Sequence, residues 1–143
     1  ESPEATDRCL ELLLSELKNK QIDKVVAIES RGFFFGMLLA KSLKVPFVPV
    51  RKPGKLPRKV ITQSFDLEYG SDVLELHQDA ISPGDKILIH DDVLATGGTA
   101  EAVCKMVESL GGQIMQCNFI MKLDFLEGFK KIESYPIFAA VSY

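Results

Sequence analysis

Three short runs of apolar and β-branched residues recur along the chain: KVVAI at 24–28, KILIH at 86–90 and QIMQCNFIM at 113–121. Continuous runs of this kind are typical of strands that are buried on both faces of a parallel sheet. Segments with the spacing of apolar residues found in helices lie between them, at 33–43 and 99–110. This alternation predicts an α/β fold, with a mostly parallel twisted sheet flanked by helices.

The remaining segments fit the same architecture. A first helix is predicted from Ser2 to about Asn19, because Ser2 and Pro3 are typical of a helix start and leucines follow at helical spacing. We further expect an edge strand at 47–50, a short exposed strand at 73–77, a short helix at 125–132 and a last strand at 137–141. Residues 51–72 are charged, rich in Pro and Gly and without periodicity, which predicts a long functional loop.

Length and composition narrow the class of protein. The 143 residues predict a single domain spanning 1–143. A formal net charge of −3 argues against nucleic-acid binding. The three cysteines are scattered, which favours free thiols in a reducing compartment over disulfides or a zinc site. The apolar stretch at 32–40 is too short to span a bilayer, and the acidic start does not resemble a signal peptide, so we expect a cytoplasmic protein without a membrane partner.

The stretch HDDVLATGGTA at 90–100 joins a predicted strand to a predicted helix. In α/β folds, ligands bind beyond the carboxyl ends of the strands. The small residues at 95–99 allow backbone N–H groups to turn inward, and the start of the helix adds free donors and a partial positive charge. This stretch therefore predicts a cradle for a phosphate monoester.

Asp91 and Asp92 stand directly before this cradle and would repel a phosphate. Carboxylates do accept both protons of two adjacent hydroxyls in charge-assisted hydrogen bonds. A ribose that carries a 5-phosphate would satisfy the acids and the cradle together. The alternative is an ordinary strand-to-helix turn with solvated acids, and the complete pattern favours the ligand site over it. Neither a Walker A loop nor a Rossmann fingerprint is present in the sequence.

With these residues in place, ILIHDDVLATGGT resembles the phosphoribosyl pyrophosphate (PRPP) signature of type I phosphoribosyltransferases. ESRGFFFG at 29–36, RKPGKLP at 51–57 and LEYG at 67–70 resemble the adenine-specific members of this family in order and spacing. The likeness runs from about Asp23 to about Gly128. It implies purine salvage, in which adenine and PRPP give AMP and pyrophosphate.

The resemblance also implies a role for each matching residue. It implies that the 5-phosphate binds to Ala95, Thr96, Gly97, Gly98 and Thr99, and that the ribose hydroxyls bind to Asp91 and Asp92. It implies that the pyrophosphate binds to Ser30, Arg31, Gly32, Arg51, Lys52 and Lys55, and that Leu123 lies near the base. Residues 54–71 would form a mobile lid carrying Glu68 and Tyr69, with Glu68 as the acid/base residue and Arg31 as the second catalytic group. A cis peptide is expected at Glu29–Ser30.

Magnesium is the cofactor that the resemblance implies. We expect PRPP to carry Mg2+ with no direct protein ligand, and Asp91 or Asp92 to reach it through water. A homodimer is expected, with some of the basic residues acting across its interface, and Phe33, Phe34 and Phe35 as core and dimer contacts.

Some residues depart from the family pattern. His90 replaces a residue that is usually aliphatic, and we interpret it as a histidine packed at a strand end. Lys122 replaces an acidic or amide residue beside the base, so it would alter the choice of purine or point to solvent. His77 is expected to be exposed and without a role.

Adenine enzymes also carry a preceding segment that forms a hood over the base. The sequence shows no such segment ahead of Glu1, so it is expected either to be trimmed or to lack the hood. Three alternatives therefore remain: transfer to another purine, a non-catalytic regulator that senses PRPP, and an inactive paralogue.

Overall fold

The computed structural model describes residues 2–143, so residue 1 of the predicted domain lies outside the described residues. The elements, in chain order, are α1 Pro3–Ser15, β1 Lys24–Ile28, α2 Gly32–Leu43, β2 Phe47–Val50, β3 Val60–Asp66, β4 Ser71–His77, β5 Lys86–Leu94, α3 Gly98–Ser109, β6 Gln113–Lys122, the 3-10 helices η1 Asp124–Leu126 and η2 Gly128–Lys131, and β7 Ile137–Ser142. The predicted helix cap is present, since the Ser2 side chain accepts a hydrogen bond from the backbone N–H of Ala5.

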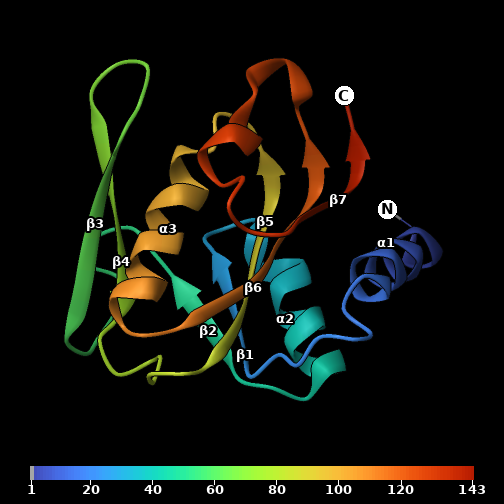
Figure 1. The fold of residues 1–143 in the computed structure, drawn as a ribbon, viewed down its shortest axis with the longest axis horizontal. Helices are drawn as coiled ribbons and strands as arrows, with labels where there is room; N and C mark the ends of the chain where they lie inside the picture. The colour runs from blue at the N-terminus through green and yellow to red at the C-terminus, as the bar shows by residue number, and fades with distance from the viewer. Residues whose placement is uncertain (1) are drawn as a thin grey trace.

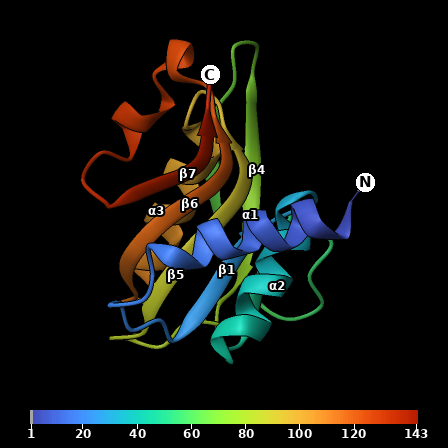
Figure 2. The same cartoon turned by 90° about the vertical axis from the view of Figure 1, so that its right-hand side faces the viewer.

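The main sheet has the strand order β2-β1-β5-β6-β7, and every neighbouring pair is parallel. The proline-containing strand β2 lies at the edge, as the sequence predicts. Helices α1 and α2 cover one face of the sheet and α3 covers the other (Figures 1 and 2). The predicted α/β fold with a parallel sheet flanked by helices is therefore confirmed. The carboxyl ends of the five strands of the main sheet therefore lie at one end of the molecule, where the loops that follow these strands meet.

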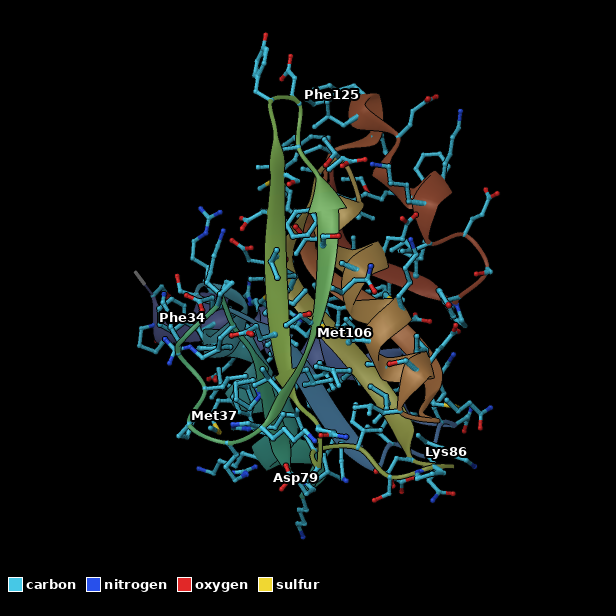
Figure 3. All side chains as sticks on the ribbon, turned by 90° about the vertical axis from the view of Figure 1, so that its left-hand side faces the viewer. Phe34, Met37, Asp79, Lys86, Met106 and Phe125 are labelled. Carbon is cyan, nitrogen blue, oxygen red and sulfur yellow. The ribbon has the colours of Figure 1, made fainter. Side chains whose placement is uncertain are left out.

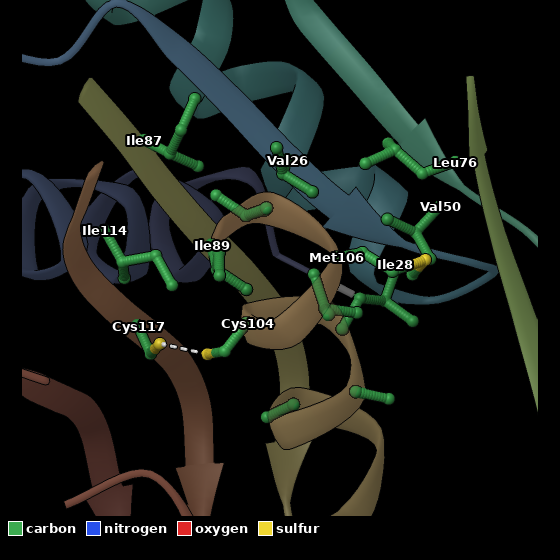
Figure 4. Packing of buried hydrophobic residues seen from close by; sticks show 14 of the residues in the cluster. Val26, Ile28, Val50, Leu76, Ile87, Ile89, Cys104, Met106, Ile114 and Cys117 are labelled. Atoms are coloured by element: carbon green, nitrogen blue, oxygen red, sulfur yellow. Dashed lines mark hydrogen bonds between the residues drawn. The ribbon is translucent and has the colours of Figure 1, made fainter. Parts of the chain in front are cut away.

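Each central strand contributes to two hydrophobic cores. Val26 and Ile89 pack with Met106 of α3 (Figure 4), whereas Val25 and Leu88 pack under α1 and α2. Successive side chains of a strand point to opposite faces, so a strand covered on both faces needs apolar residues at every position. Burying a side chain of this size contributes about 1.5–3 kcal/mol. This explains the unbroken apolar runs in the sequence.

The cysteines are free thiols, as predicted. Cys104 of α3 and Cys117 of β6 are buried in the core, with their sulfur atoms 3.7 Å apart (Figure 4). The hydrogen bond with the Cys104 sulfur, together with burial, raises the pKa of the Cys117 thiol well above its ordinary value. Cys9, on α1, is half-buried and packs against the core on that side of the sheet.

The segment 51–72 is not the irregular loop that the sequence predicts. Strands β3 and β4 form an antiparallel hairpin that begins inside this segment, at Val60, and ends after it, at His77. The hairpin lies along α3 (Figure 1), and the Phe65 ring reaches the start of that helix. The prediction failed because alternating strands such as VITQSFD gain their stability from cross-strand pairing and packing rather than from local propensity.

Several boundaries and burial predictions also need correction. The end of the hairpin is buried rather than exposed, and His77 is only 7% accessible to solvent. His77 contacts Arg58, whose backbone N–H and side chain both approach the imidazole ring. The first helix ends at Ser15, four residues before the predicted end. The predicted helix at 125–132 is instead a pair of 3-10 turns, and β5 continues to Leu94.

Across residues 2–143, no helix combines the length and the apolar character that crossing a membrane requires.

Candidate active site

Four loops meet at the end of the sheet where the strands terminate (Figure 1). They are the segment 30–32 after β1, the basic loop 51–55 after β2, the phosphate cradle 95–99 after β5, and the segment that begins at Leu123 after β6. Adjacent parallel strands place their following loops side by side. The predicted site residues, which are scattered over about 90 positions of sequence, therefore gather at one edge.

The phosphate cradle is a tight turn followed directly by a helix. Gly97 has a φ of 85°, a conformation that glycine adopts without strain, and α3 begins at Gly98. Residues 94–97 and Thr99 line a small hollow at the start of α3, and Asp91 borders it. The structure thus brings together the five residues predicted to hold the 5-phosphate and places them at a helix N-terminus, as anion binding requires.

The acid pair, Asp91 and Asp92, lies in the last part of β5, beside the cradle. One Asp91 oxygen accepts a hydrogen bond from the backbone N–H of Asp92 at 2.8 Å. One carboxylate oxygen of Asp92 pairs with Nε of Arg31 at 2.8 Å. Burial raises the pKa of Asp91, and the adjacent Asp92 carboxylate raises it further. In this half-buried site, the two neighbouring carboxyl groups therefore disfavour carrying a negative charge at the same time.

The segment 30–32 approaches the acid pair closely. The peptide bond Glu29–Ser30 is cis, as expected. A Cβ atom on Gly32 would lie 3.0 Å from an Asp91 carboxylate oxygen and 3.3 Å from its Cα. A side chain at position 32 would therefore push this segment away from the acids. Ser30 and Arg31 are exposed at the same place and remain open to a ligand.

The basic loop carries the remaining predicted cations, and each of them is paired with a carboxylate. The Lys52 ammonium contacts Asp72 of β4. Arg51 and Lys55 both pair with Glu29, at 3.3 Å and 2.7 Å. Glu29 also accepts a hydrogen bond from the backbone N–H of Lys52 at 2.7 Å. Burial alone would raise the pKa of Glu29, but the hydrogen bonds from Lys55 and Lys52 outweigh it and lower the pKa.

A cleft of about 450 Å³ connects these groups. It is lined by Ile28, Glu29, Ser30, Arg31, Lys52, Phe65, Leu67, Asp72, Leu74, Asp91, Asp92 and Thr99. A larger and mostly apolar hollow runs along the outer side of α1, around Leu12 and Leu14, and contains none of the predicted site residues. The smaller polar cleft is the better candidate, because phosphates and sugar hydroxyls need charged and hydrogen-bonding partners.

Not every predicted residue lines the cleft. Arg51 and Lys55 do not line it, and both pair with Glu29, which does. Glu68 and Tyr69 lie at the tip of the β3–β4 hairpin, and both are exposed, with Tyr69 at 87%. The hairpin tip stands at the same end of the molecule as the strand tips (Figure 1), while Leu67 beside it does line the cleft.

Leu123 begins the segment on the base side of the site. Its backbone N–H donates to the carbonyl of Leu94 at 3.0 Å, which joins this segment to the end of β5. Lys122 does not extend freely into solvent. Its ammonium pairs with Asp124 at 3.1 Å and lies 5.8 Å from the centre of the Phe129 ring.

His90 is fully buried on β5, directly before the acid pair. Its Nδ1 lies 2.7 Å from Oδ1 of Asn118 on β6, and its Nε2 has no hydrogen-bond partner within residues 2–143. Burial lowers the pKa of His90 to about 4, although the Asn118 contact acts in the opposite direction. The packed histidine that the sequence predicts is confirmed, but it lies inside the strand rather than at its end.

The sequence did not reveal three contributors to the site. Glu29 joins the loops after β1 and β2, Asp72 pairs with Lys52 from the hairpin, and Gly128 lies against the cradle. Position alone could have identified Glu29, because it follows a buried strand directly. Asp72 and Gly128 contribute through contacts with residues far away in the sequence, and such contacts leave no local sequence pattern.

The chain is similar to known proteins over nearly all of its length. Residues 2–137 match the phosphoribosyl transferase domain family. The chain is 64% identical to the adenine phosphoribosyltransferase of Flavobacterium johnsoniae over 140 residues, which cover 98% of this chain and 82% of that protein.

Solved structures agree with this similarity. The adenine phosphoribosyltransferase of Rhodothermus marinus matches with a TM-score of 0.96 at 48% identity, covering 99% of this chain and 81% of that chain. The Saccharomyces cerevisiae enzyme, complexed with D-2,5-dideoxy-2,5-imino-altritol 1,6-bisphosphate and adenine, matches with a TM-score of 0.90 at 41% identity. That match covers 96% of this chain and 80% of the yeast chain.

Proposed function

The chain belongs to the phosphoribosyltransferase family, among its adenine phosphoribosyltransferases, and we propose that it transfers the phosphoribosyl group of PRPP to adenine. The products are AMP and pyrophosphate, and the reaction serves purine salvage. The observation that supports this most directly is the continuity of the acid pair with the phosphate cradle. Asp91 borders the hollow of the cradle and also lines the larger cleft, so one ribose 5-phosphate would reach both.

The charged groups of the cleft suit a displacement at the anomeric carbon. Adenine attacks that carbon, the bond to pyrophosphate breaks, and the ribose passes through a state with oxocarbenium character, as in glycoside hydrolysis. Asp91 and Asp92 hold the ribose hydroxyls. When the hydroxyls occupy Asp92, its partner Arg31 is released and can stabilise the negative charge that develops on pyrophosphate.

The pyrophosphate is assigned to 30–32 and the basic loop. Ser30, Arg31 and Lys52 line the cleft and reach it directly. Arg51 and Lys55 pair with Glu29 and do not line the cleft, so they would act only after leaving Glu29, or at the site of a second copy. Cations placed beside the leaving group would stabilise its developing negative charge.

Magnesium would be held through the substrate. Among residues 2–143, no cluster of three or more His, Cys, Asp or Glu side chains could hold a metal ion by itself. The two carboxylates of the acid pair are hard oxygen donors that fit Mg2+ through water or ribose oxygens. When bound, the ion would neutralise charge on the pyrophosphate.

The hairpin acts as the lid in this proposal. Glu68 lies at its tip outside the cleft, so the tip must bend toward the strand ends to bring the carboxylate near the base at Leu123. Closure would also exclude water, which otherwise traps an oxocarbenium-like ribose. Gly70, with a φ of 85° and open space around it, gives the tip a permissive turn.

We further propose a cytoplasmic homodimer in which each chain is one phosphoribosyltransferase domain. Phe34 and Met37 project from the outer side of α2 (Figure 3), with 70% and 53% of their surfaces exposed. They lie three residues apart on the helix, so they form one apolar patch. Phe33 packs against Phe47 and Phe35 joins the core under α2, so Phe34 is the aromatic of the three that faces outward.

The direct test is product formation. Purified protein with adenine, PRPP and Mg2+ should form AMP and pyrophosphate, and hypoxanthine and guanine should give much less product. Product formation with hypoxanthine or guanine but not with adenine would show that adenine is not the substrate base. Binding of PRPP without turnover of any base would support a PRPP-sensing protein or an inactive paralogue.

A further inference from the structure

The phosphate cradle contains no basic side chain of its own. Its hollow is lined by Asp91 and residues 93–97, 99 and 100, which are apolar, small or hydroxyl-bearing apart from the acid. A phosphate monoester carries a charge of about −1.5 to −2 near neutral pH. Backbone N–H groups and the helix terminus supply only partial positive charges. A complete 5-phosphate site at this position therefore calls for a nearby cation.

Lys131 carries a cation close to the cradle, although it does not line the hollow itself. It is the last residue of η2, and its Nζ lies 3.9 Å from the position that a Cβ atom would occupy on Gly98, the first residue of α3. Within residues 2–143 Lys131 takes part in no ion pair. The neighbouring Lys130, by contrast, pairs with Glu127 at 3.0 Å. The Lys131 ammonium thus lies near the start of α3 and has no ion-pair partner among residues 2–143.

The position of Lys131 follows from a contact between two stretches of backbone. A Cβ atom on Gly128, the first residue of η2, would lie 2.2 Å from the carbonyl oxygen of Ala95 and 2.8 Å from the Gly97 nitrogen. A Cβ atom on Gly97 would lie 2.3 Å from the carbonyl oxygen of Gly128. Only two glycines permit this approach. The turn that carries Lys131 therefore rests directly on the phosphate cradle.

We propose that Lys131 binds the 5-phosphate of PRPP and of AMP, and that the contact between Gly128 and Gly97 positions it there. This inference rests on the proposed phosphoribosyl transfer and adds a residue to its phosphate site. A lysine ammonium is a compact charge on a flexible chain and reaches a phosphate oxygen without a fixed geometry. Because the 5-phosphate remains on the ribose throughout the reaction, Lys131 contributes to binding rather than to the chemical step.

The test compares Lys131→Gln with wild type. Loss of a charge-assisted hydrogen bond should weaken AMP binding about tenfold in calorimetry and raise the KM for PRPP by a similar factor. The kcat, the KM for adenine at saturating PRPP and the melting temperature should stay unchanged. Lys131→Arg should restore most of the AMP affinity, because it returns the charge.

Lys130→Gln is the matched control, since Lys130 lies in the same turn and pairs only with Glu127. Equal AMP affinity in wild type and Lys131→Gln would overturn the inference, as would equal losses in Lys130→Gln and Lys131→Gln. The proposed function fails differently: wild-type protein itself would then show neither AMP binding nor turnover. A larger effect of Lys131→Gln at low salt than at high salt would support a charge interaction.

Discussion

At the scale of single residues, the candidate site consists of carboxylates and cations that already satisfy each other. Arg31 pairs with Asp92, Lys52 with Asp72, and Glu29 serves two cations at once. A ligand that combines hydroxyls with phosphates can replace both members of such a pair. In the proposed reaction, the protein would therefore exchange internal ion pairs for ligand contacts, which avoids leaving charges unpaired in a half-buried cleft before substrate arrives.

Asp92→Asn should weaken PRPP binding by about ten- to a hundredfold, because a hydroxyl partner in the cleft loses its charge. The substitution preserves the shape of the side chain, so the fold should be unaffected. Titration calorimetry with PRPP and Mg2+ measures the change. Asp79→Asn is the control, since Asp79 forms an exposed pair with Arg58 away from the cleft. Unchanged PRPP affinity in Asp92→Asn would refute the assignment of Asp92 to the ribose.

His90 should make the protein less stable in mild acid. Its pKa is about 4 in the folded protein and 6.5 in the unfolded chain. The unfolded chain therefore binds an extra proton as pH falls from about 6.5 to about 4, which removes about 3 kcal/mol of stability over that range. Stability from neutral His90 is complete above pH 6.5 and lost below pH 4.

His90→Leu should abolish this part of the pH dependence. Urea unfolding at pH 7, 6, 5 and 4 would compare the slopes of unfolding free energy against pH in the two proteins. Other acids contribute similarly to both, so the difference between the slopes isolates His90. Parallel curves would show that the imidazole does not stay neutral in the folded protein.

At the scale of elements, the helices and strands of the main sheet could be predicted because their signals are local. Periodicity and continuous apolar runs located α2, β1, β5, α3 and β6 to within a few residues. In the hairpin, the predicted strand at 73–77 is part of β4, but β3 was missed, since polar residues alternate along it and its partner lies beyond a turn. The 3-10 turns η1 and η2 were also missed as such, because the contact of Gly128 with the cradle fixes the second of them.

Those parts of the candidate site that lie on consecutive residues could also be predicted from local sequence signals. Motifs on consecutive residues, such as those at 29–36 and 90–100, identified the acid pair and the cradle. Glu29, Asp72 and Lys131 were not identified, because each matters through a partner far away in the sequence. The sequence could also not indicate that Arg51 and Lys55 pair with Glu29 and do not line the cleft.

Glu68→Gln tests the hairpin as an element that moves during the reaction. Glu68 is exposed and outside the cleft in this structure, so it should contribute little to binding of PRPP. If closure brings it to the base as the acid/base residue, kcat should fall by about a hundredfold while the KM for PRPP stays within about twofold. Steady-state kinetics with adenine and PRPP varied separately measures both constants. Equal losses in kcat and in PRPP affinity would indicate that Glu68 only shapes the lid.

At the scale of the whole molecule, Phe34 and Met37 form an exposed apolar patch on α2. This helix directly follows the segment 30–32, so a partner covering the patch would also support one wall of the site. The basic loop offers a reason for association as well. Arg51 and Lys55 pair with Glu29 and do not line the cleft of their own chain, so a role at the site of another copy would account for them.

Phe34→Glu should therefore convert a homodimer into a monomer, since burying an unpaired carboxylate in an apolar contact costs several kcal/mol. Sedimentation velocity at micromolar concentration would follow the change, and circular dichroism would check that the monomer keeps its fold. Leu12→Glu is the matched control, because Leu12 is 48% exposed on α1 and lies outside the patch. A wild-type monomer, or an unchanged dimer in Phe34→Glu, would contradict this interface. If Arg51 and Lys55 serve the second copy, the monomer should also lose most of its turnover while still binding AMP, because the phosphate cradle and the acid pair belong to a single chain.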